Sequence, residues 1–256
     1  MVIWPQVEQF GLLFVRVGAF VSMLPILGGA QVPAVPKLGL TGLLTYFMFT
    51  IAGSPQQSLP GDLTGFFLWV VVEATIGLGL GFLTKMLFSG VQMAGEIVGR
   101  QIGFSMAQTF DPTFQTRTSI MSEFYLMVMM LIYLIFNGPH FLIQGLAESY
   151  HYLPLGGRLS TAGIEVPVME MAGGLFVSCV RVAAPVLATL MLTNIALGIL
   201  ARTVPQMNVF MVGLPLRIGV GLLAMVLTIQ LFVYIFQAEW NQFQLGFEAI
   251  MRLLAG

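Results

Sequence analysis

The feature that most constrains this chain is a succession of long apolar runs with very few charges. Residues 182–201 and 218–238 contain no charged side chain at all. A helix needs about 20 mostly apolar residues to cross the hydrocarbon core of a bilayer. Only 8% of the residues are charged and 57% are hydrophobic, whereas soluble domains carry about 25% charged residues. We therefore expect an all-α integral membrane protein with about six to seven apolar helical segments.

A glycine-rich stretch near the middle of the chain carries two regular stripes. Its small residues recur every fourth position, at Gly95, Gly99 and Gly103. This spacing places them on one helical face and allows two backbones to approach closely. Beside them, Glu96 precedes Arg100 by four residues, the favourable order for a helical ion pair. We expect this helix to contact protein or water, and not lipid on all sides, and we expect its ion pair to be buried.

Charged residues also interrupt other apolar runs. Arg16 lies in the first run, Glu73 in the middle of the third and Arg181 in the sixth. Ionised groups are costly in hydrocarbon, so such residues usually pair or line a pathway. Arg16 is equally compatible with snorkelling to the interface and with a polar contact inside a complex. Together with Glu96 and Arg100, Glu73 and Arg181 would also suit a stand-alone solute transporter or channel, which is the alternative function.

The run lengths and turn residues predict where helices begin and end. We expect separate helices at residues 63–84 and 85–107. The apolar run at residues 168–200 is too long for one simple span, so Arg181 and Pro185 are expected to divide it. Asn137, Gly138 and Pro139 predict a turn or kink.

Two segments alternate apolar and polar residues with a helical period. Residues 141–153 predict a short amphipathic helix at an interface or against a partner. Residues 239–256 predict an amphipathic helix lying on a surface.

Catalytic and cofactor motifs do not assemble in this sequence. The two histidines, His140 and His151, lack the HExxH spacing of zinc proteases. Neither a GxSxG nucleophile elbow nor a GxxxxGK[ST] phosphate loop occurs. We therefore expect no enzyme activity, no metal and no cofactor. The net charge of −1 gives no indication of nucleic-acid binding.

A series of motifs resembles the FliR family, the membrane component of the bacterial flagellar type III export gate. Its injectisome counterparts form the SctT group. The motifs, in chain order, are FVRVGAF, AGEIVGRQIGF, the Phe110-Asp111-Pro112 loop, FNGPHFLIQGLAESYHYLPLG and ARTVPQMNVFMVGLPLRI. They extend from about residue 10 to the C-terminus, so the resemblance covers nearly the whole chain.

The resemblance implies a fold and a role in an assembly. Residues 1–167 would form a FliP-like part, and residues 168–256 a FliQ-like helical hairpin with an amphipathic tail. With FliP and FliQ, and next to FlhB and FlhA, the chain would build a helical pore complex. That complex would pass unfolded flagellar subunits across the bacterial inner membrane, within the flagellar basal body. The charged residues of its nominal spans would then pair across subunits, and the glycine stripe would seat neighbouring subunits.

The resemblance also implies site residues in two loops. The loop at about residues 103–119 would plug the pore, through Gly103, Phe104, Ser105, Met106, Phe110, Asp111, Pro112 and Phe114. The alternative is an ordinary loop whose aromatic side chains anchor it in the membrane. The tip of the hairpin would contact neighbouring hairpins through Arg202, Pro205, Gln206, Asn208 and Arg217. Here the alternative is a positively charged turn without a partner contact.

Overall fold

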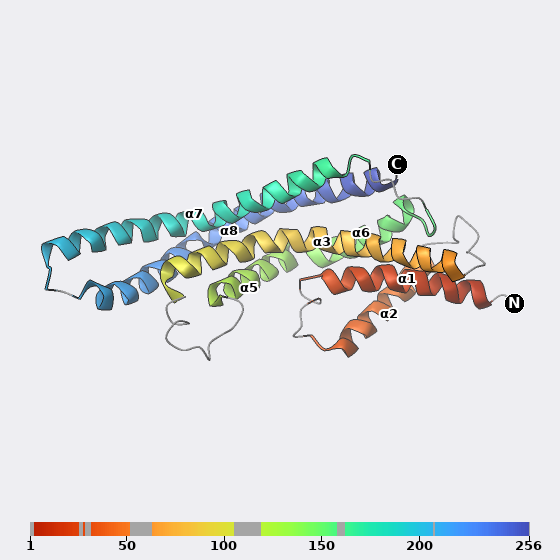
Figure 1. Cartoon of the computed structure of the whole chain (residues 1–256), viewed down its shortest axis with the longest axis horizontal. Helices are drawn as coiled ribbons and strands as arrows, with labels where there is room; N and C mark the ends of the chain where they lie inside the picture. Colours follow the sequence, from red (N-terminus) through yellow and green to blue (C-terminus); the bar gives the residue numbers. More distant parts are fainter. Residues whose placement is uncertain are drawn as a thin grey trace. The chain divides into compact units, whose positions relative to one another are not determined.

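A computed structural model shows that the chain is built of helices. It describes residues 3–25, 28, 32–51, 63–104, 119–157, 162–206 and 208–255. Within these ranges there are seven helices and no strand (Figure 1). They are α1 (Ile3–Met23), α2 (Ala34–Ile51), α3 (Leu63–Ile102), α5 (Ile120–Ile135), α6 (Gly138–Tyr152), α7 (Glu165–Thr203) and α8 (Val209–Ala255). The predicted all-α class is confirmed.

Four of the described helices, α2, α3, α7 and α8, are long and apolar enough to cross a membrane. Helices α5 and α6 add a fifth candidate if they are counted together as one broken span. Helix α1 is not among the candidates, and five of its apolar residues are buried in the protein: Leu12, Leu13, Val17, Phe20 and Val21. The composition therefore predicted the membrane class correctly.

Three helices are much longer than a bilayer is thick. Helices α3, α7 and α8 have 40, 39 and 47 residues. At 1.5 Å per residue they measure about 60 to 70 Å, against about 30 Å for the hydrocarbon core. The predicted break between residues 84 and 85 is wrong, because Lys85 is a good helix former and α3 continues through it.

The predicted division of the long run at Arg181 and Pro185 is also wrong. Helix α7 continues through Pro185. The hydroxyl of Thr189 donates a hydrogen bond to the carbonyl of Pro185 at 2.9 Å. Long apolar helices tolerate an internal proline where neighbouring helices and hydroxyl side chains support the local backbone.

The breaks that do occur use residues suited to a left-handed backbone. Asn137 has φ = 54° between α5 and α6, a conformation that asparagine adopts more readily than most residues. A proline, Pro139, occupies the first turn of α6, where its missing N–H is not needed. The predicted turn is confirmed here. Gly103, with φ = 104°, follows the last residue of α3, a common place for glycine.

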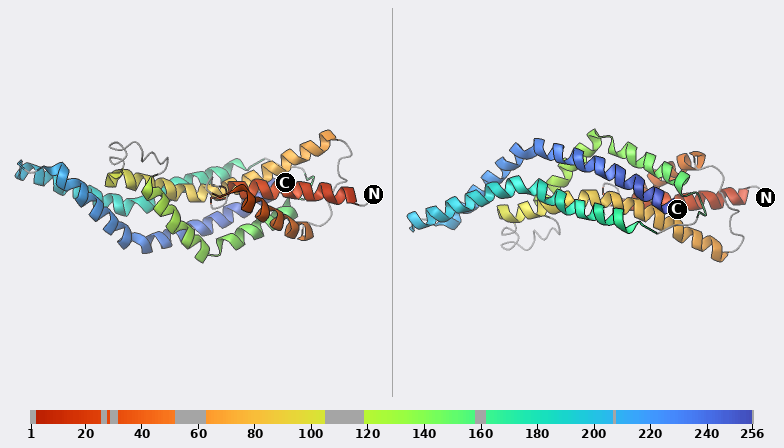
Figure 2. Two further views of the ribbon diagram at one scale, coloured as in Figure 1. Left: turned by 90° about the horizontal axis from the view of Figure 1, so that it is seen from below. Right: turned by 90° about the horizontal axis from the view of Figure 1, so that it is seen from above.

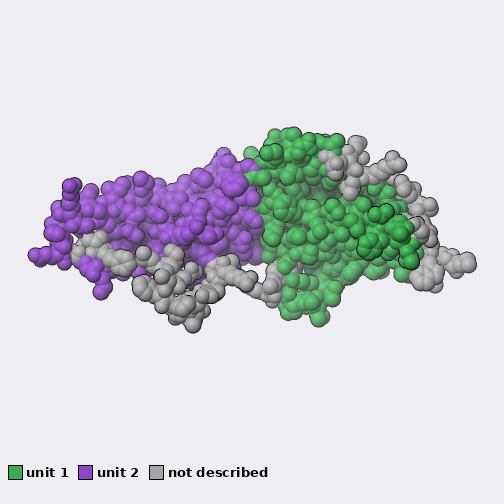
Figure 3. Space-filling view, viewed as in Figure 1, with its two compact units in different colours: residues 1–87, 137–172, 242–256 green, residues 88–136, 173–241 purple. Residues whose placement is uncertain are grey.

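The chain divides into two compact units (Figure 3). One unit comprises Met1–Leu87, Asn137–Ala172 and Gln242–Gly256, and the other comprises Phe88–Phe136 and Gly173–Asn241. Each unit therefore takes residues from both sides of the sequence division expected between residues 167 and 168. The core of the first unit includes Leu12, Leu13, Val17, Leu80, Leu146 and Phe247. The core of the second includes Val98, Ile102, Met129, Val186, Leu190 and Phe236.

Helices α7 and α8 form an antiparallel hairpin (Figure 2). The last part of α8 corresponds to the predicted surface helix. It is continuous with the rest of α8, and Phe247 is fully buried. The rings of Phe243 and Phe247 lie 6.1 and 5.6 Å from that of Phe141 in α6. The amphipathic pattern at both segments was real, but each segment buries its apolar face against the other and not on a membrane surface.

Candidate functional site

The most polar point of the first unit is the guanidinium of Arg16. Its Nε donates to Oε2 of Glu73 at 2.5 Å. Its Nη1 donates to the carbonyl and hydroxyl of Ser149 at 3.2 and 3.3 Å, and its Nη2 to the carbonyl of Leu153 at 2.9 Å. Arg16 is 0% exposed and Glu73 is 1% exposed. One side chain therefore joins α1, α3 and the C-terminal end of α6.

The surroundings of Arg16 favour a buried cation. Its Cζ atom lies 4.3 Å from the centroid of the Tyr150 ring, within the range of a cation–π contact. The carbonyl groups at the end of α6 also carry the negative end of a helix dipole. A buried ion pair is tolerated when further hydrogen bonds satisfy its charges, and the guanidinium of Arg16 donates such bonds to Ser149 and Leu153.

This geometry decides between the readings of Arg16 left open by the sequence. Arg16 does not snorkel, because its guanidinium lies in the core of the unit. Its partners all belong to this chain, so the expectation of a pair across subunits is wrong for Arg16 and Glu73. The physical reason is that α1 and α3 approach closely enough to bring the two side chains together inside the unit.

That close approach depends on glycines in α3. A Cβ atom at Gly77 would overlap the carbonyl oxygen of Arg16, and one at Gly81 would overlap Met23. Gly77 and Gly81 follow Glu73 at intervals of four residues, so all three lie on the face that meets α1. Gly79 has open space around it. Of Gly77, Gly79 and Gly81, the first and the last therefore serve packing.

The glycine stripe of the second unit also packs within the chain. A Cβ atom at Gly95 would lie 2.7 Å from the carbonyl oxygen of Met121, and one at Gly99 would lie 2.5 Å from the hydroxyl of Ser119. At Gly103 the nearest neighbour is Leu214, at 2.9 Å. The close approach predicted from the spacing exists. Its partners are α8 and the start of α5, so the expectation that these glycines seat a neighbouring subunit is corrected.

Two ion pairs of the second unit lie near its surface. Arg100 Nη1 lies 4.0 Å from Oε1 of Glu96, and the two side chains are 63% and 55% exposed. The pair predicted from the i,i+4 spacing is present, but within this chain it is not buried. Arg181 Nη1 lies 3.3 Å from Oε1 of Glu239 in α8, so Arg181 also has a partner in its own chain.

The residues at the tip of the hairpin are mostly exposed. Arg202 lies in the last turn of α7, and Pro205 and Gln206 lie between the end of α7 and the start of α8. Asn208 accepts a hydrogen bond from the backbone N–H of Met211 at 3.3 Å through its side-chain oxygen. This is the geometry of a helix N-cap, so the Asn208 side chain has a structural task at the start of α8.

The predicted plug residues fall almost entirely outside the described part of the chain. Gly103 and the half-buried Phe104 are described at the end of α3. The remaining plug residues, Ser105, Met106, Phe110, Asp111, Pro112 and Phe114, lie outside the described residues. The proposal for this loop therefore depends on residue types and on the family.

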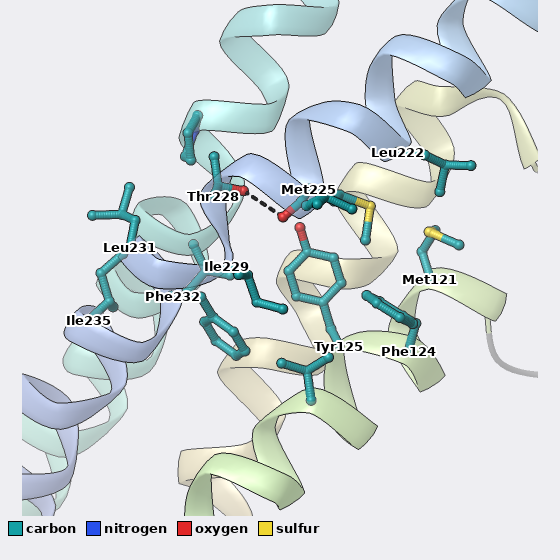
Figure 4. A pocket seen from close by; sticks show the side chains of 14 residues that line it. Met121, Phe124, Tyr125, Leu222, Met225, Thr228, Ile229, Leu231, Phe232 and Ile235 are labelled. Atoms are coloured by element: carbon teal, nitrogen blue, oxygen red, sulfur yellow. Dashed lines mark hydrogen bonds between the residues drawn. The ribbon is translucent and has the colours of Figure 1, made fainter.

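An apolar cavity of about 370 Å³ lies in the second unit (Figure 4). Helices α5, α7 and α8 line it, and Tyr125 stands among Met225, Ile229 and Phe232. Thr228 is the other polar residue in the lining, and its hydroxyl donates to the carbonyls of Ala224 and Met225 in its own helix at 2.8 and 3.2 Å. The lining offers van der Waals contact and almost no directional polar chemistry. Among the described residues, no group of three or more His, Cys, Asp or Glu side chains could hold a metal ion.

Large apolar side chains are exposed along α8 from Met211 to Tyr234, and again at Leu245 beyond the exposed polar residues Gln237, Asn241 and Gln242. Met211, near its start, is 71% exposed, and Leu245, near its end, is 70% exposed. Between them lie further exposed residues: Leu223, Val226, Leu227 and Tyr234. At 1.5 Å per residue, the helix from Met211 to Leu245 is about 50 Å long. A bilayer core about 30 Å thick cannot cover all of it.

Comparison with known proteins identifies the family. Residues 7–243 match the sequence profile of bacterial export proteins, family 1. The chain belongs to this family. It is 34% identical to the flagellar biosynthetic protein FliR of Bacillus subtilis over 249 residues, which cover 96% of this chain and 94% of that protein.

Other FliR proteins are similarly close. The FliR of Escherichia coli is 35% identical over 209 residues, covering 81% of this chain and 78% of that protein. The FliR of Pectobacterium carotovorum is 30% identical over 235 residues, covering 90% and 87%. The resemblance drawn from the motifs is thus confirmed at the level of the family.

Sequence reasoning missed several residues around Arg16 in this family member. Ser149, Tyr150 and Leu153 are separated from Arg16 by more than 130 positions, and two of the contacts are made by backbone carbonyls. No sequence pattern encodes a carbonyl acceptor at such a distance. The i,i+4 series of Glu73, Gly77 and Gly81 was a usable signal, because it places a carboxylate on the small-residue face of α3.

Proposed function

We propose that this chain is a non-catalytic subunit of the flagellar type III protein export gate. It would assemble with FliP and FliQ, next to FlhB and FlhA, in the basal body at the bacterial inner membrane. The assembly would pass unfolded flagellar subunits. Membership of the export family supports the role, and one structural observation carries the assembly: the face of α8 over which exposed apolar side chains recur is longer than a bilayer can cover.

The length of that face can be compared with what tilting allows. Membrane helices tilt by up to about 40° from the bilayer normal. At that tilt, a hydrocarbon core of about 30 Å covers about 40 Å of helix. The face from Met211 to Leu245 is about 50 Å long. Exposed apolar side chains at one end of this face, either around Met211 or at Leu245, therefore lie beyond the bilayer, where another protein chain can cover them.

The alternative of a stand-alone solute transporter loses its main support. Its residues were Glu73, Glu96, Arg100 and Arg181. In the structure these four belong to three separate ion pairs, and Glu73 is occupied by the buried Arg16. The charged groups of a transport pathway face the interior of a helix bundle or a water-filled cavity, whereas Glu96, Arg100 and Arg181 are exposed at the surface of the second unit.

Co-expression tests the assembly. The full chain, expressed with the FliP- and FliQ-like proteins of the same organism, is expected to purify as a complex whose mass by native mass spectrometry contains all three. The same chain expressed alone is the control, and it is expected to be poorly stable. A stable single chain that takes up a solute into liposomes, with no complex in the co-expression, would overturn the proposal.

We further propose that the segment around residues 103–119 plugs the pore of that assembly. Its aromatic and methionine residues, Phe104, Met106, Phe110 and Phe114, suit closure by packing and dewetting. Deleting residues 107–115 is expected to raise the ion conductance of the purified complex in planar bilayers. A deletion of the same length within residues 52–62 is the control. Equal conductance of the plug deletion and the intact complex would refute the plug.

A further inference from the structure

The seam between α7 and α8 is apolar and tight near the tip of the hairpin. A side-chain carbon of Leu197 lies 3.4 Å from the Cβ position of Gly213. About two helical turns further from the tip, a side-chain carbon of Leu190 lies 3.4 Å from the Cβ position of Gly221. These two contacts fix the register of the two helices in this region.

Asn194 and Arg217 fall between these two contacts. Asn194 is four residues from Leu190 and three from Leu197, so it shares their face of α7. Arg217 is midway between Gly213 and Gly221 at intervals of four, so it shares their face of α8. The register therefore brings an amide and a guanidinium to the same level of an otherwise apolar seam.

Each of the two side chains has a buried polar atom without a hydrogen bond among the described residues. These atoms are Oδ1 of Asn194 and Nε of Arg217. Among the described carboxylates of the second unit, Glu96 pairs with Arg100 and Glu239 with Arg181, and the exposed Glu123 forms no ion pair with Arg217. A buried polar atom left without a partner is destabilising, and in native proteins it usually has one.

We propose that Asn194 and Arg217 together bind a carboxamide side chain, Gln or Asn, from a helix of a partner subunit. A carboxamide carries its acceptor and donor on separate atoms. Its oxygen would accept from Arg217 Nε, and its nitrogen would donate to Asn194 Oδ1 across the seam. A carboxylate or a lipid phosphate only accepts, so it would leave the asparagine oxygen without a donor. This site rests on the proposed function, because it needs a partner chain.

The surface next to the site fits a helix as the occupant. Ile195 and Leu216 are the sequence neighbours of the two residues, and they are 51% and 43% exposed. A partner helix that covers these apolar side chains would bring a polar side chain to the seam. Buried Asn and Gln side chains form hydrogen bonds between helices in membranes.

Substitution in the co-expressed complex tests the site. Asn194→Leu and Arg217→Met are each expected to lower the amount of co-purified partner at least several-fold. The double variant is expected to lose no more co-purified partner than the Arg217→Met variant alone, because the effects of two substitutions at residues that bind the same group are not additive. The matched controls, Asn241→Leu and Arg252→Met, change exposed residues outside the seam and are expected to behave like the wild type.

Photo-crosslinking keeps the proposal testable if a variant folds poorly. A photoreactive amino acid at Leu216 is expected to capture a partner segment with Gln or Asn within one helical turn of the crosslink. A captured segment without either residue overturns the proposal. An unchanged amount of co-purified partner in both single variants also overturns the proposal, because water would then satisfy the site. Loss of bound anionic lipid from these variants, with no loss of partner, overturns it as well. Each of these outcomes overturns the carboxamide site and leaves the proposed function standing. A wild-type chain that recovers no partner overturns both the site and the proposed function.

Discussion

Helix α3 contains two glutamates that look alike in sequence and differ completely in the structure. Both Glu73 and Glu96 lie in apolar surroundings, and each has a glycine stripe nearby. Glu73 is buried and pairs with Arg16, 57 positions away along the chain. Glu96 is largely exposed and pairs with Arg100 one turn further along its own helix, with 4.0 Å between Arg100 Nη1 and Glu96 Oε1.

The difference shows that the face on which a charge lies matters more than the charge itself. Glu73 is on the glycine face of α3, and Gly77 and Gly81 let α1 cover it. Glu96 is beside the glycine face formed by Gly95 and Gly99, so it projects past the packed contact with α5. Removing one partner of a buried pair typically costs about 3–5 kcal/mol, whereas an exposed pair contributes about 0–1 kcal/mol.

The largest expected effect is from Arg16→Met, which leaves Glu73 buried without a counter-charge. We expect the free energy of unfolding, measured by denaturant titration in detergent, to fall by about 3–5 kcal/mol. The double variant Arg16→Met, Glu73→Leu removes both charges and is expected to recover much of that loss. A single variant as stable as the wild type would show that the pair does not hold α1, α3 and α6 together.

The next effect concerns the close approach of α1 and α3. Gly77→Ala places a methyl group against the carbonyl oxygen of Arg16, so the two helices must separate. We expect a loss of about 1–3 kcal/mol in the same titration, the usual range for an overpacked contact. Gly79→Ala is the matched control. It meets open space and is expected to be neutral or to stabilise α3 by up to about 1 kcal/mol. Equal losses in the two variants would contradict the assigned faces.

The smallest expected effect is from Glu96→Gln in the isolated chain. Because both side chains are more than half exposed, the unfolding free energy should stay within about 0.5 kcal/mol of the wild-type value. The same variant in the co-expressed complex sharpens the comparison. A marked loss of partner there would show that a neighbouring chain covers Glu96, whereas no loss would leave Glu96 at the solvent.

The pattern of correct and incorrect helix boundaries has a local explanation. The break at Asn137 and Gly138 was predictable because the backbone conformation there favours particular residues. The continuity of α3 through Lys85 and of α7 through Pro185 was not predictable from the same rules. Lysine does not oppose a helix, and an internal proline is tolerated where neighbouring groups support the backbone.

The sequence by itself determined the all-α membrane class, the family and the residues able to pack closely, because these depend on composition and on helical spacing. Only the tertiary structure decided which partners those residues have. It paired Arg16 with Glu73 and with carbonyls of α6, and it used Gly95 and Gly99 against α5. It also brought Asn194 level with Arg217. The physical reason is that spacing fixes the face of a helix on which a residue lies, whereas the helix that covers this face depends on the packing of the whole chain.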